Sequence, residues 1–193
     1  MGRIVVTEFI SLDGVIEDPG GSEDFRYGGW SFEFDRGDEG DKFKLDETRQ
    51  SEALLLGRVT YQGFADAWPS REGEFADKFN TMPKYVVSST LQDPAWKNST
   101  VLTGDDVMAQ VAKLRQDLSG DIVVHGSARL VQALVEHDLV DEVRLMVFPV
   151  VLGRGKRLFG ATTGKKRLRL ADVKTVGAGV AILTYQPSAE KAG

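Results

Sequence analysis

Short apolar runs alternate with segments of helical periodicity along this chain, and that alternation constrains its fold more than any other feature. The runs typical of strands lie at residues 3–10, 53–57, 84–88, 122–124 and 143–147. Helices are expected at residues 42–52, 58–68 and 107–118 and in the segment that follows Ser127. Strands that alternate with helices usually pair in parallel and are covered by those helices. The sequence therefore predicts an α/β domain.

The segment at residues 107–118 shows the regular spacing of an amphipathic helix. Its apolar positions are Val107, Val111, Leu114 and Leu118. Residues 103–106 fit a capping-box pattern that begins at Thr103, and Gly120 follows as a stop signal. Further on, apolar runs at residues 168–173 and 180–184 flank a Gly-Ala-Gly turn, which predicts a closing antiparallel pair. We expect one domain over residues 1–187 and a tail at residues 188–193.

The segment at residues 18–41 is rich in glycine, acidic residues and aromatic residues. It is too irregular for a helix or strand and too aromatic for a disordered linker, so an ordered loop is expected over a site. Its rings could pack on a core of their own or form a lid over a ligand. Both interpretations remain open from the sequence.

Composition excludes several classes of function. The chain has 24 lysine and arginine residues against 29 aspartate and glutamate residues, and its net charge of −5 argues against a nucleic-acid binder. The absence of cysteine excludes disulfides, a thiolate nucleophile and thiolate metal sites, and with two histidines no metal site is predicted. Without an apolar run of about 20 residues or a signal peptide, we expect a cytoplasmic protein with no membrane partner.

Glycine residues and residues with hydroxyl side chains recur where the predicted strands end. Gly57 separates a strand from a helix, Ser88 and Ser89 follow another strand, and Gly126 and Ser127 follow a third. The carboxyl ends of strands and the first turns of helices are where α/β sheets bind phosphate-containing ligands. A phosphate-binding groove is therefore expected at this edge of the sheet.

The order and spacing of these motifs resemble the dihydrofolate reductase-like superfamily, from residue 3 to about residue 187. Within it, the chain is most similar to the reductase domain of the bacterial riboflavin-biosynthesis deaminase-reductase. The motifs are Ser11-Leu12-Asp13-Gly14, Gly57-Arg58-x-Thr60-Tyr61, Ser88-Ser89, x-Gly126 and Pro149-x-x-x-Gly153-x-Gly155. The resemblance implies a three-layer α/β/α fold with a mixed, mostly parallel sheet and a C-terminal antiparallel hairpin. It also implies NADPH as cofactor.

The resemblance also implies roles for residues of the groove. Arg58, Ser88 and Ser89 match positions beside the 2′-phosphate of NADPH, although Arg58 could instead form a salt bridge at the end of the sheet. Backbone groups near Phe9 and Ile16 would hold the nicotinamide carboxamide. The pyrophosphate would be bound by Gly57, Thr60, His125, Gly126, Ser127 and Ala128. His125 stands where relatives often have glycine, and it could bind a phosphate oxygen or simply flank the turn.

Asp13 is the carboxylate nearest to the expected nicotinamide, and we hypothesise that it orients the substrate or a proton-delivering water. The alternative is that Asp13 and Gly14 only form a tight turn. The candidate substrate-binding residues are Thr7, Trp30 and Phe64, although the helical spacing of Phe64 also suits core packing. A carboxylate for a pterin would come from Asp46 or Glu47.

We therefore expect an NADPH-dependent reductase of a heterocyclic substrate, with 5-amino-6-(5-phosphoribosylamino)uracil reductase as its representative. Val15 replaces the basic residue that usually follows the Ser-Leu-Asp-Gly motif, and the acidic segment after it disfavours a substrate phosphate. The alternatives are a dihydrofolate or other pterin reductase and a non-catalytic nucleotide-binding protein. Relatives are commonly homodimers, and residues 145–152 offer an apolar surface for that contact.

Overall fold

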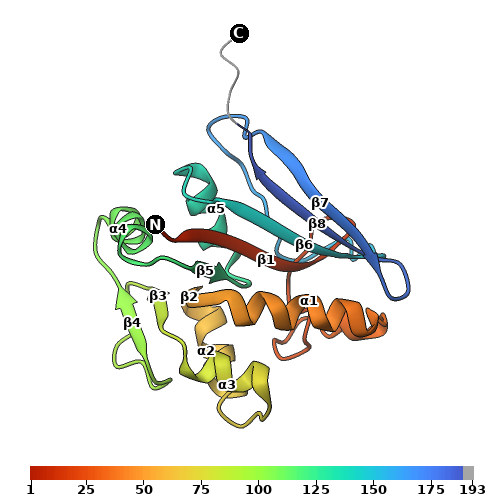
Figure 1. Cartoon of the computed structure of the whole chain (residues 1–193), viewed down its shortest axis with the longest axis horizontal. Helices are drawn as coiled ribbons and strands as arrows, with labels where there is room; N and C mark the ends of the chain where they lie inside the picture. Colours follow the sequence, from red (N-terminus) through yellow and green to blue (C-terminus); the bar gives the residue numbers. More distant parts are fainter. Residues whose placement is uncertain (189–193) are drawn as a thin grey trace.

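The computed structural model describes residues 1–188, which form one eight-stranded sheet with helices on both faces (Figure 1). In space the strands follow the order β4-β3-β2-β5-β1-β6-β8-β7. Their bounds are β1 Arg3–Ser11, β2 Ser51–Gly57, β3 Lys84–Val87, β4 Ser99–Leu102, β5 Asp121–Val124, β6 Glu142–Phe148, β7 Leu168–Val176 and β8 Val180–Pro187. The tail predicted at residues 188–193 lies, except for Ser188, outside the described residues.

The sheet is parallel from β4 to β6 and antiparallel beyond it. β8 pairs antiparallel with β6, and β7 pairs antiparallel with β8 around the turn at Gly177 and Gly179. The strand β1 therefore lies in the middle of the sheet, between β5 and β6. The predicted mixed, mostly parallel sheet with a C-terminal antiparallel hairpin is confirmed.

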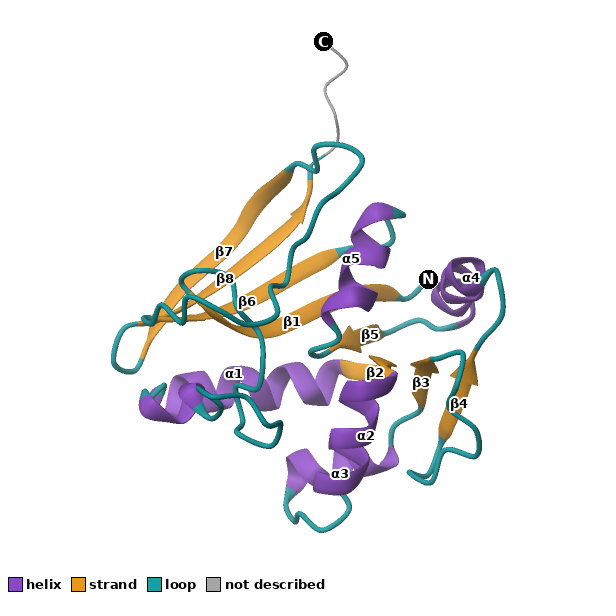
Figure 2. Cartoon of the chain, turned by 180° about the vertical axis from the view of Figure 1, so that it is seen from behind, coloured by secondary structure: helices purple, strands orange, loops and turns teal. Residues whose placement is uncertain are grey.

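The helices form the two outer layers of the domain (Figure 2). Their bounds are η1 Trp30–Glu33, a 3₁₀ turn, α1 Gly37–Gln50, α2 Arg58–Ala67, α3 Glu74–Thr81, α4 Val107–Asp117 and α5 Ala128–Glu136. On one face, α4 and α5 pack on Ile4 and Val6 of β1, while on the other face α2 and α3 pack on Val5. Successive residues of a strand point to opposite faces, so β1 needs apolar side chains on both.

Several elements differ from those expected from the sequence. The helix α1 begins at Gly37 rather than at residue 42, and α3 and β4 were not predicted. The side chain that caps α4 is Asp106, which accepts a hydrogen bond from the amide of Ala109, so the assignment of Thr103 as the cap is wrong. The expected loop at residues 18–41 also includes η1 and the first turn of α1.

The apolar segment at residues 145–152 is buried in its strand half and exposed in the loop that follows. Leu145, Met146 and Phe148 of β6 are buried between β1 and β8, whereas Val151 is 68% exposed. The homodimer and its contact surface stay predictions. Exposed apolar side chains also occur on the edge strand β7, where Leu170 and Val173 are 51% and 55% exposed. Within residues 1–188, no helix is long and apolar enough to cross a membrane.

Candidate functional site

A cavity of about 1190 Å³ opens at the carboxyl ends of the parallel strands. Residues from β1, β2 and β3 line it, together with the turn after β5 and the first turns of α2 and α5. It continues between α1, α2 and α3, so one space connects the edge of the sheet with the helices on one face. Ligands of open α/β sheets bind at this edge.

Two helices begin at this cavity without a side-chain cap. Gly57 is the N-cap of α2, Ser127 is the N-cap of α5, and neither makes a side-chain capping hydrogen bond. Uncapped amides at the start of a helix bind anions, because they are unpaired donors at the positive end of the helix dipole. Arg58 and Arg129 add two exposed guanidinium groups to the lining at these helix starts.

The turn between β5 and α5 is fixed by hydroxyl groups. The Oγ of Ser127 accepts from the amide of Gly57 at 2.9 Å, and both the amide and the hydroxyl of Ser127 donate to Oγ1 of Thr60 at 3.0 Å. Gly126 has φ +55°, and a Cβ there would lie 2.9 Å from Oγ1 of Thr60. Glycine is therefore required at this position, and the starts of α2 and α5 are held in register.

The donors at this end of the cavity suit phosphate groups. Besides the uncapped amides and the two arginines, hydroxyl groups follow β3 and β4; these are Ser88, Ser89, Thr90 and Thr103. Guanidinium groups and amides are the usual partners of phosphate oxygens in proteins. The site can therefore hold the phosphates of a dinucleotide such as NADPH. Arg129 was not foreseen, since it belongs to no recognised sequence motif, and Thr103 was expected only as part of a capping box.

Glu8 is a carboxyl group in the middle of the sheet, and it also lines the cavity. It is 6% exposed, and its Oε2 accepts a hydrogen bond from the amide of Gly126 at 2.9 Å. Its Oε1 is buried and makes no hydrogen bond with any other described residue. Burial raises the pKa of Glu8 well above its usual value, against the lowering effects of the Gly126 amide and of Lys44. The sequence signal was one polar residue within an apolar strand.

His125 lies against an aromatic wall of the cavity. Its ring centroid is 6.1 Å from that of Phe64 and 5.4 Å from that of Phe79. Burial, helped by the positive charge of Lys44, lowers the pKa of His125 to about 3. The imidazole is therefore neutral at physiological pH, so it cannot act as a cation toward a phosphate.

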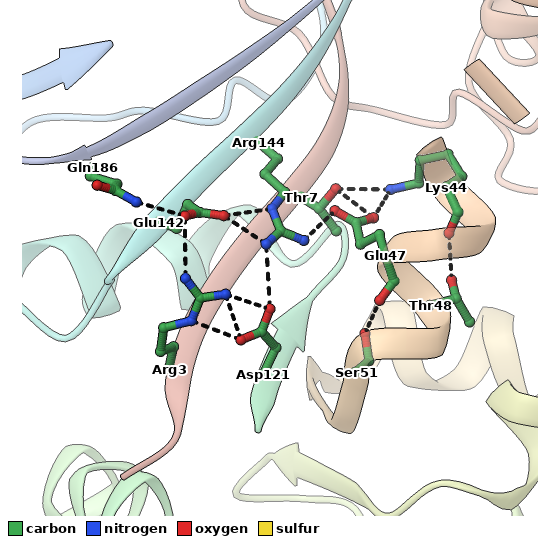
Figure 3. A network of polar contacts seen from close by, with 10 residues as sticks. All are labelled: Arg3, Thr7, Lys44, Glu47, Thr48, Ser51, Asp121, Glu142, Arg144 and Gln186. Carbon is green, nitrogen blue, oxygen red and sulfur yellow. Dashed lines mark hydrogen bonds and ion pairs between the residues drawn. The ribbon is translucent and has the colours of Figure 1, made fainter. Parts of the chain in front are cut away.

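A polar network connects Lys44, which lines the cavity, with β1, β5 and β6 (Figure 3). Lys44 of α1 donates to Thr7 at 2.8 Å and forms an ion pair with Glu47, which also accepts from Thr7. Glu47 pairs in turn with Arg144 of β6 at 3.3 Å, and the network continues through Asp121, Glu142, Arg3 and Gln186. Although burial opposes it, the charge of Lys44 lowers the pKa of Glu47. The Lys44 ammonium group is thus held at the cavity by fixed partners.

Aromatic rings line the part of the cavity between α2 and α3. They are Phe64, Trp68, Phe75 and Phe79. The rings of Trp68 and Phe75 are stacked at 5.2 Å. Arg36, Lys44 and Arg71 line the same cavity, as do the carboxylates Glu17, Asp18, Glu23 and Glu72, and the guanidinium of Arg71 lies 4.5 Å from the centroid of the Trp68 ring. An aromatic compartment of this kind suits a flat ligand.

Most of the residues expected at the site line this one cavity. They are Thr7, Phe9, Ile16, Gly57, Arg58, Thr60, Phe64, Ser88, Ser89, His125, Gly126, Ser127 and Ala128. Arg58 is exposed and donates to Gln62 of its own helix at 3.1 Å, rather than forming a salt bridge at the end of the sheet. Two expected residues, Asp13 and Trp30, are not among the residues that line the cavity.

Asp13 joins the turn after β1 to the loop that follows β6. Its carboxylate accepts hydrogen bonds from Oγ of Ser11 at 2.7 Å and from the amides of Leu152 and Gly153 at 3.1 and 2.8 Å. The Ser11 hydrogen bond, followed by those of the two amides, lowers the pKa of Asp13 to about 2. This geometry favours the turn interpretation over the hypothesis of a catalytic Asp13.

Trp30 belongs to the core rather than to the ligand site. It is 1% exposed, its ring packs edge-on against Phe148 at 5.5 Å, and its Nε1 donates to the carbonyl of Glu17. These contacts fix the segment before α1 onto the sheet. Phe32, two residues further on, is 75% exposed and does line the cavity.

Comparison with known proteins agrees with this architecture. A family model described as the RibD C-terminal domain matches residues 3–182. The uncharacterized protein YyaP from Bacillus subtilis (strain 168) is 29% identical over 188 residues, which are 95% of this chain and 94% of YyaP.

Two solved structures show the fold. A putative riboflavin biosynthesis protein from Shewanella sp. PV-4 has a TM-score of 0.76 and 19% identity, covering 97% of this chain and 99% of that protein. Dihydrofolate reductase from Enterococcus faecalis, complexed with NADP(H) and RAB-propyl, has a TM-score of 0.57 and 14% identity, covering 97% of each chain. The predicted dihydrofolate reductase-like fold is confirmed.

Proposed function

Because the chain belongs to the RibD C-terminal domain family, we propose that it is an NADPH-dependent reductase that transfers hydride to a heterocyclic substrate. One observation carries this proposal. A single cavity connects a group of phosphate-binding donors with an aromatic compartment, and a nicotinamide dinucleotide and a flat substrate need these two environments side by side.

The residues at the sheet edge would hold the nucleotide. Arg58 and Arg129, with the hydroxyls of Ser88 and Ser89, would bind the 2′-phosphate that distinguishes NADPH from NADH. The uncapped amides of α2 and α5 would bind the pyrophosphate, and the backbone near Phe9 and Ile16 would bind the carboxamide. When bound, the nucleotide supplies the hydride, and the chain supplies its orientation and shields the reaction from water.

A phosphorylated pyrimidine is the substrate that family membership suggests. Arg71 supplies positive charge beside the aromatic rings, whereas Arg36 and Lys44 are paired with Asp41 and Glu47, and the carboxylates Glu17, Asp18, Glu23 and Glu72 also line the cavity. The representative activity is 5-amino-6-(5-phosphoribosylamino)uracil reductase. A pterin reductase is less favoured, since Asp46 is paired with Lys42 and Arg49, Glu47 is paired with Lys44, and neither carboxylate lines the cavity.

The proposal is tested by calorimetric titration of the protein with NADPH and, separately, with NADH. Arg58→Ala should weaken NADPH binding by about 1.5–3 kcal/mol, because a charged hydrogen bond to the 2′-phosphate is lost, and should leave NADH binding unchanged. Arg154→Ala, at an exposed arginine outside the cavity lining, is the matched control. Equal effects of Arg58→Ala on both nucleotides would refute the role of Arg58. Failure of the wild-type protein to bind either nucleotide would refute the proposed function.

A further inference from the structure

Glu8 is the buried carboxyl group that the proposed nucleotide and substrate contacts leave unexplained. It lies near the carboxyl end of β1, and its Oε2 accepts from the Gly126 amide, so it connects the ends of the neighbouring strands β1 and β5. It is one of the residues that line the cavity, as are Arg58 at the phosphate-binding end and Phe64 in the aromatic compartment.

The second oxygen of Glu8 lacks any compensating partner. Its Oε1 is buried and makes no hydrogen bond within residues 1–188. An ionised carboxylate in this position would leave a buried charge with a single backbone donor, and such a charge is costly unless it is paired. A protonated carboxyl avoids this cost, since Oε2 still accepts from Gly126 and Oε1 becomes a donor.

The charged groups around Glu8 do not supply that pairing. Lys44 faces it from α1, but this ammonium is already bound by Glu47 and Thr7, and the Glu47 carboxylate raises the pKa of Glu8 further. His125, beside Gly126 at the end of β5, is neutral at physiological pH. Neither Lys44 nor His125 therefore pairs directly with Glu8 among the described residues.

Other carboxyl groups near the site are bound as acceptors. Asp13 accepts three hydrogen bonds outside the cavity lining, and Glu17 pairs with Lys156 at 3.0 Å. Asp18 accepts from two backbone amides through Oδ1, while its Oδ2 is buried without a hydrogen-bond partner among the described residues. The hydrogen bonds of Asp13 lower its pKa to about 2, so Asp13 carries no proton to donate at neutral pH.

We propose that Glu8 is an uncharged carboxylic acid and that it donates the proton that accompanies hydride transfer to a C=N bond of the substrate. This inference rests on the proposed function. The O–H bond of Glu8 breaks and leaves its electron pair on Oε1, while the substrate nitrogen forms an N–H bond with the electron pair of the C=N π bond. The neighbouring carbon receives the hydride, for which a reduced nicotinamide is the donor by chemical class.

The resulting carboxylate has stabilising groups within the same network. The Gly126 amide continues to donate to Oε2, and the positive charge of Lys44 favours the ionised form while a ligand fills the cavity. Water that enters after product release restores the proton. A general acid of this kind works best when its pKa is raised toward neutral pH, as burial achieves for Glu8.

The protonation state is measured first, without cofactor or substrate. Infrared difference spectroscopy at neutral pH should show the stretching band of a protonated carboxyl group in the wild-type protein. Glu8→Gln should remove that band, because glutamine keeps the acceptor for Gly126 but is not an acid. Glu136→Gln, at a carboxylate of α5 that is bound to Thr163 outside the cavity lining, is the matched control and should retain the band. A wild-type protein without a band that depends on Glu8 would overturn the proposal.

The donor role is then measured by titration and turnover. Glu8→Gln should bind NADPH within about twofold of wild type, yet its kcat with 5-amino-6-(5-phosphoribosylamino)uracil or dihydrofolate should fall about 100-fold or more, with KM little changed. The wild-type rate should decrease as pH rises through the pKa of Glu8, and the variant should lose this dependence. An unchanged kcat in Glu8→Gln would overturn the donor role. If the wild-type protein shows the infrared band but does not bind NADPH, the reductase role and the proton-donor role of Glu8 are both overturned. The uncharged state of Glu8 is then established by itself.

Discussion

Lys84 offers a direct test of how the wall of the cavity is held in place. This lysine of β3 is fully buried, and its Nζ donates to the backbone carbonyls of Asn80, Met82 and Lys97 at 3.1, 2.8 and 3.1 Å. The ammonium also lies 4.3 Å from the ring centroid of Trp96. Two of the three carbonyls belong to the end of α3 and the turn after it, so Lys84 anchors the helix that carries Phe79.

The expected cost of Lys84→Met follows from these contacts. Methionine fills a similar volume but donates nothing, so three buried carbonyls lose a charged donor. At about 1–3 kcal/mol for each unsatisfied group, and with partial relaxation, the free energy of unfolding should fall by about 3–5 kcal/mol. For a chain of this size, the melting temperature should fall by about 6–20 °C.

Urea unfolding at constant pH, followed by circular dichroism, measures this difference. Lys97→Met is the matched control, since the Lys97 side chain is exposed and its carbonyl is kept. The control should change the free energy of unfolding by less than about 0.5 kcal/mol. A loss below about 1 kcal/mol in Lys84→Met would show that the three hydrogen bonds do not hold α3, and the reasoning would fail.

Two further predictions concern the turn beside Glu8. Because the pKa of His125 is about 3 when folded and about 6.5 when unfolded, the unfolded chain binds the extra proton and wild type loses stability as pH falls from 6.5 toward 3. His125→Phe should remove this part of the loss of stability, so the urea midpoints of the variant and the wild type should converge or cross at acidic pH. If the two plots of midpoint against pH run parallel, the lowered pKa of His125 is contradicted. Gly126→Ala should lower the free energy of unfolding by about 1–3 kcal/mol and weaken NADPH binding, because φ is +55° and Oγ1 of Thr60 is too close. Gly153→Ala is the control, because Gly153 has φ +75° but an added Cβ there would meet no atom within 4 Å, so the variant has the backbone strain without the clash. Equal losses of unfolding free energy in the two variants would contradict the predicted clash.

The parts of the fold that follow a regular pattern could be read from the sequence. The strands β1, β2 and β5 were found because their buried residues are apolar on both faces, as in Val5 and Val6, and β6 was found because its apolar residues alternate with others, as in Val143 and Arg144. The helix α1 was misplaced because the face it buries is polar and includes Lys44, Glu47 and Thr48. These residues enter an ion-pair network whose partners are distant in the sequence, so no local periodicity marks the helix.

The missed elements have a different cause. The helix α3 has eight residues, five of them polar or charged, and β4 has four residues at the edge of the sheet with only Leu102 buried. Elements this short carry little pattern of their own and form because the rest of the domain supports them. The same limit explains Arg129, whose place at the cavity depends on where α5 begins.

The residues of the candidate site also divide into those marked by local sequence motifs and those placed by contacts between distant segments. Local motifs such as Gly57-Arg58 and Gly126-Ser127 lead to the cavity, because a strand followed by a helix start is a local event. The role of Asp13 stayed open in the sequence, since its hydrogen bonds to Leu152 and Gly153 connect segments about 140 residues apart. Only the three-dimensional arrangement separates a carboxylate that fastens a loop from Glu8, which faces the cavity.

The position of β1 in the sheet has a consequence for synthesis of the chain. β1 emerges from the ribosome first among the strands, yet its partners β5 and β6 are the fifth and sixth strands to be made, and Val6 pairs with Val124. Until then, three apolar residues that are fully buried in the native sheet, Ile4, Val5 and Val6, have no strand to pair with. Pairing across such separations is slow and leaves apolar segments exposed to association with other chains. A chaperone that binds extended apolar segments should therefore engage nascent chains through β1 and release them once β6 has been made.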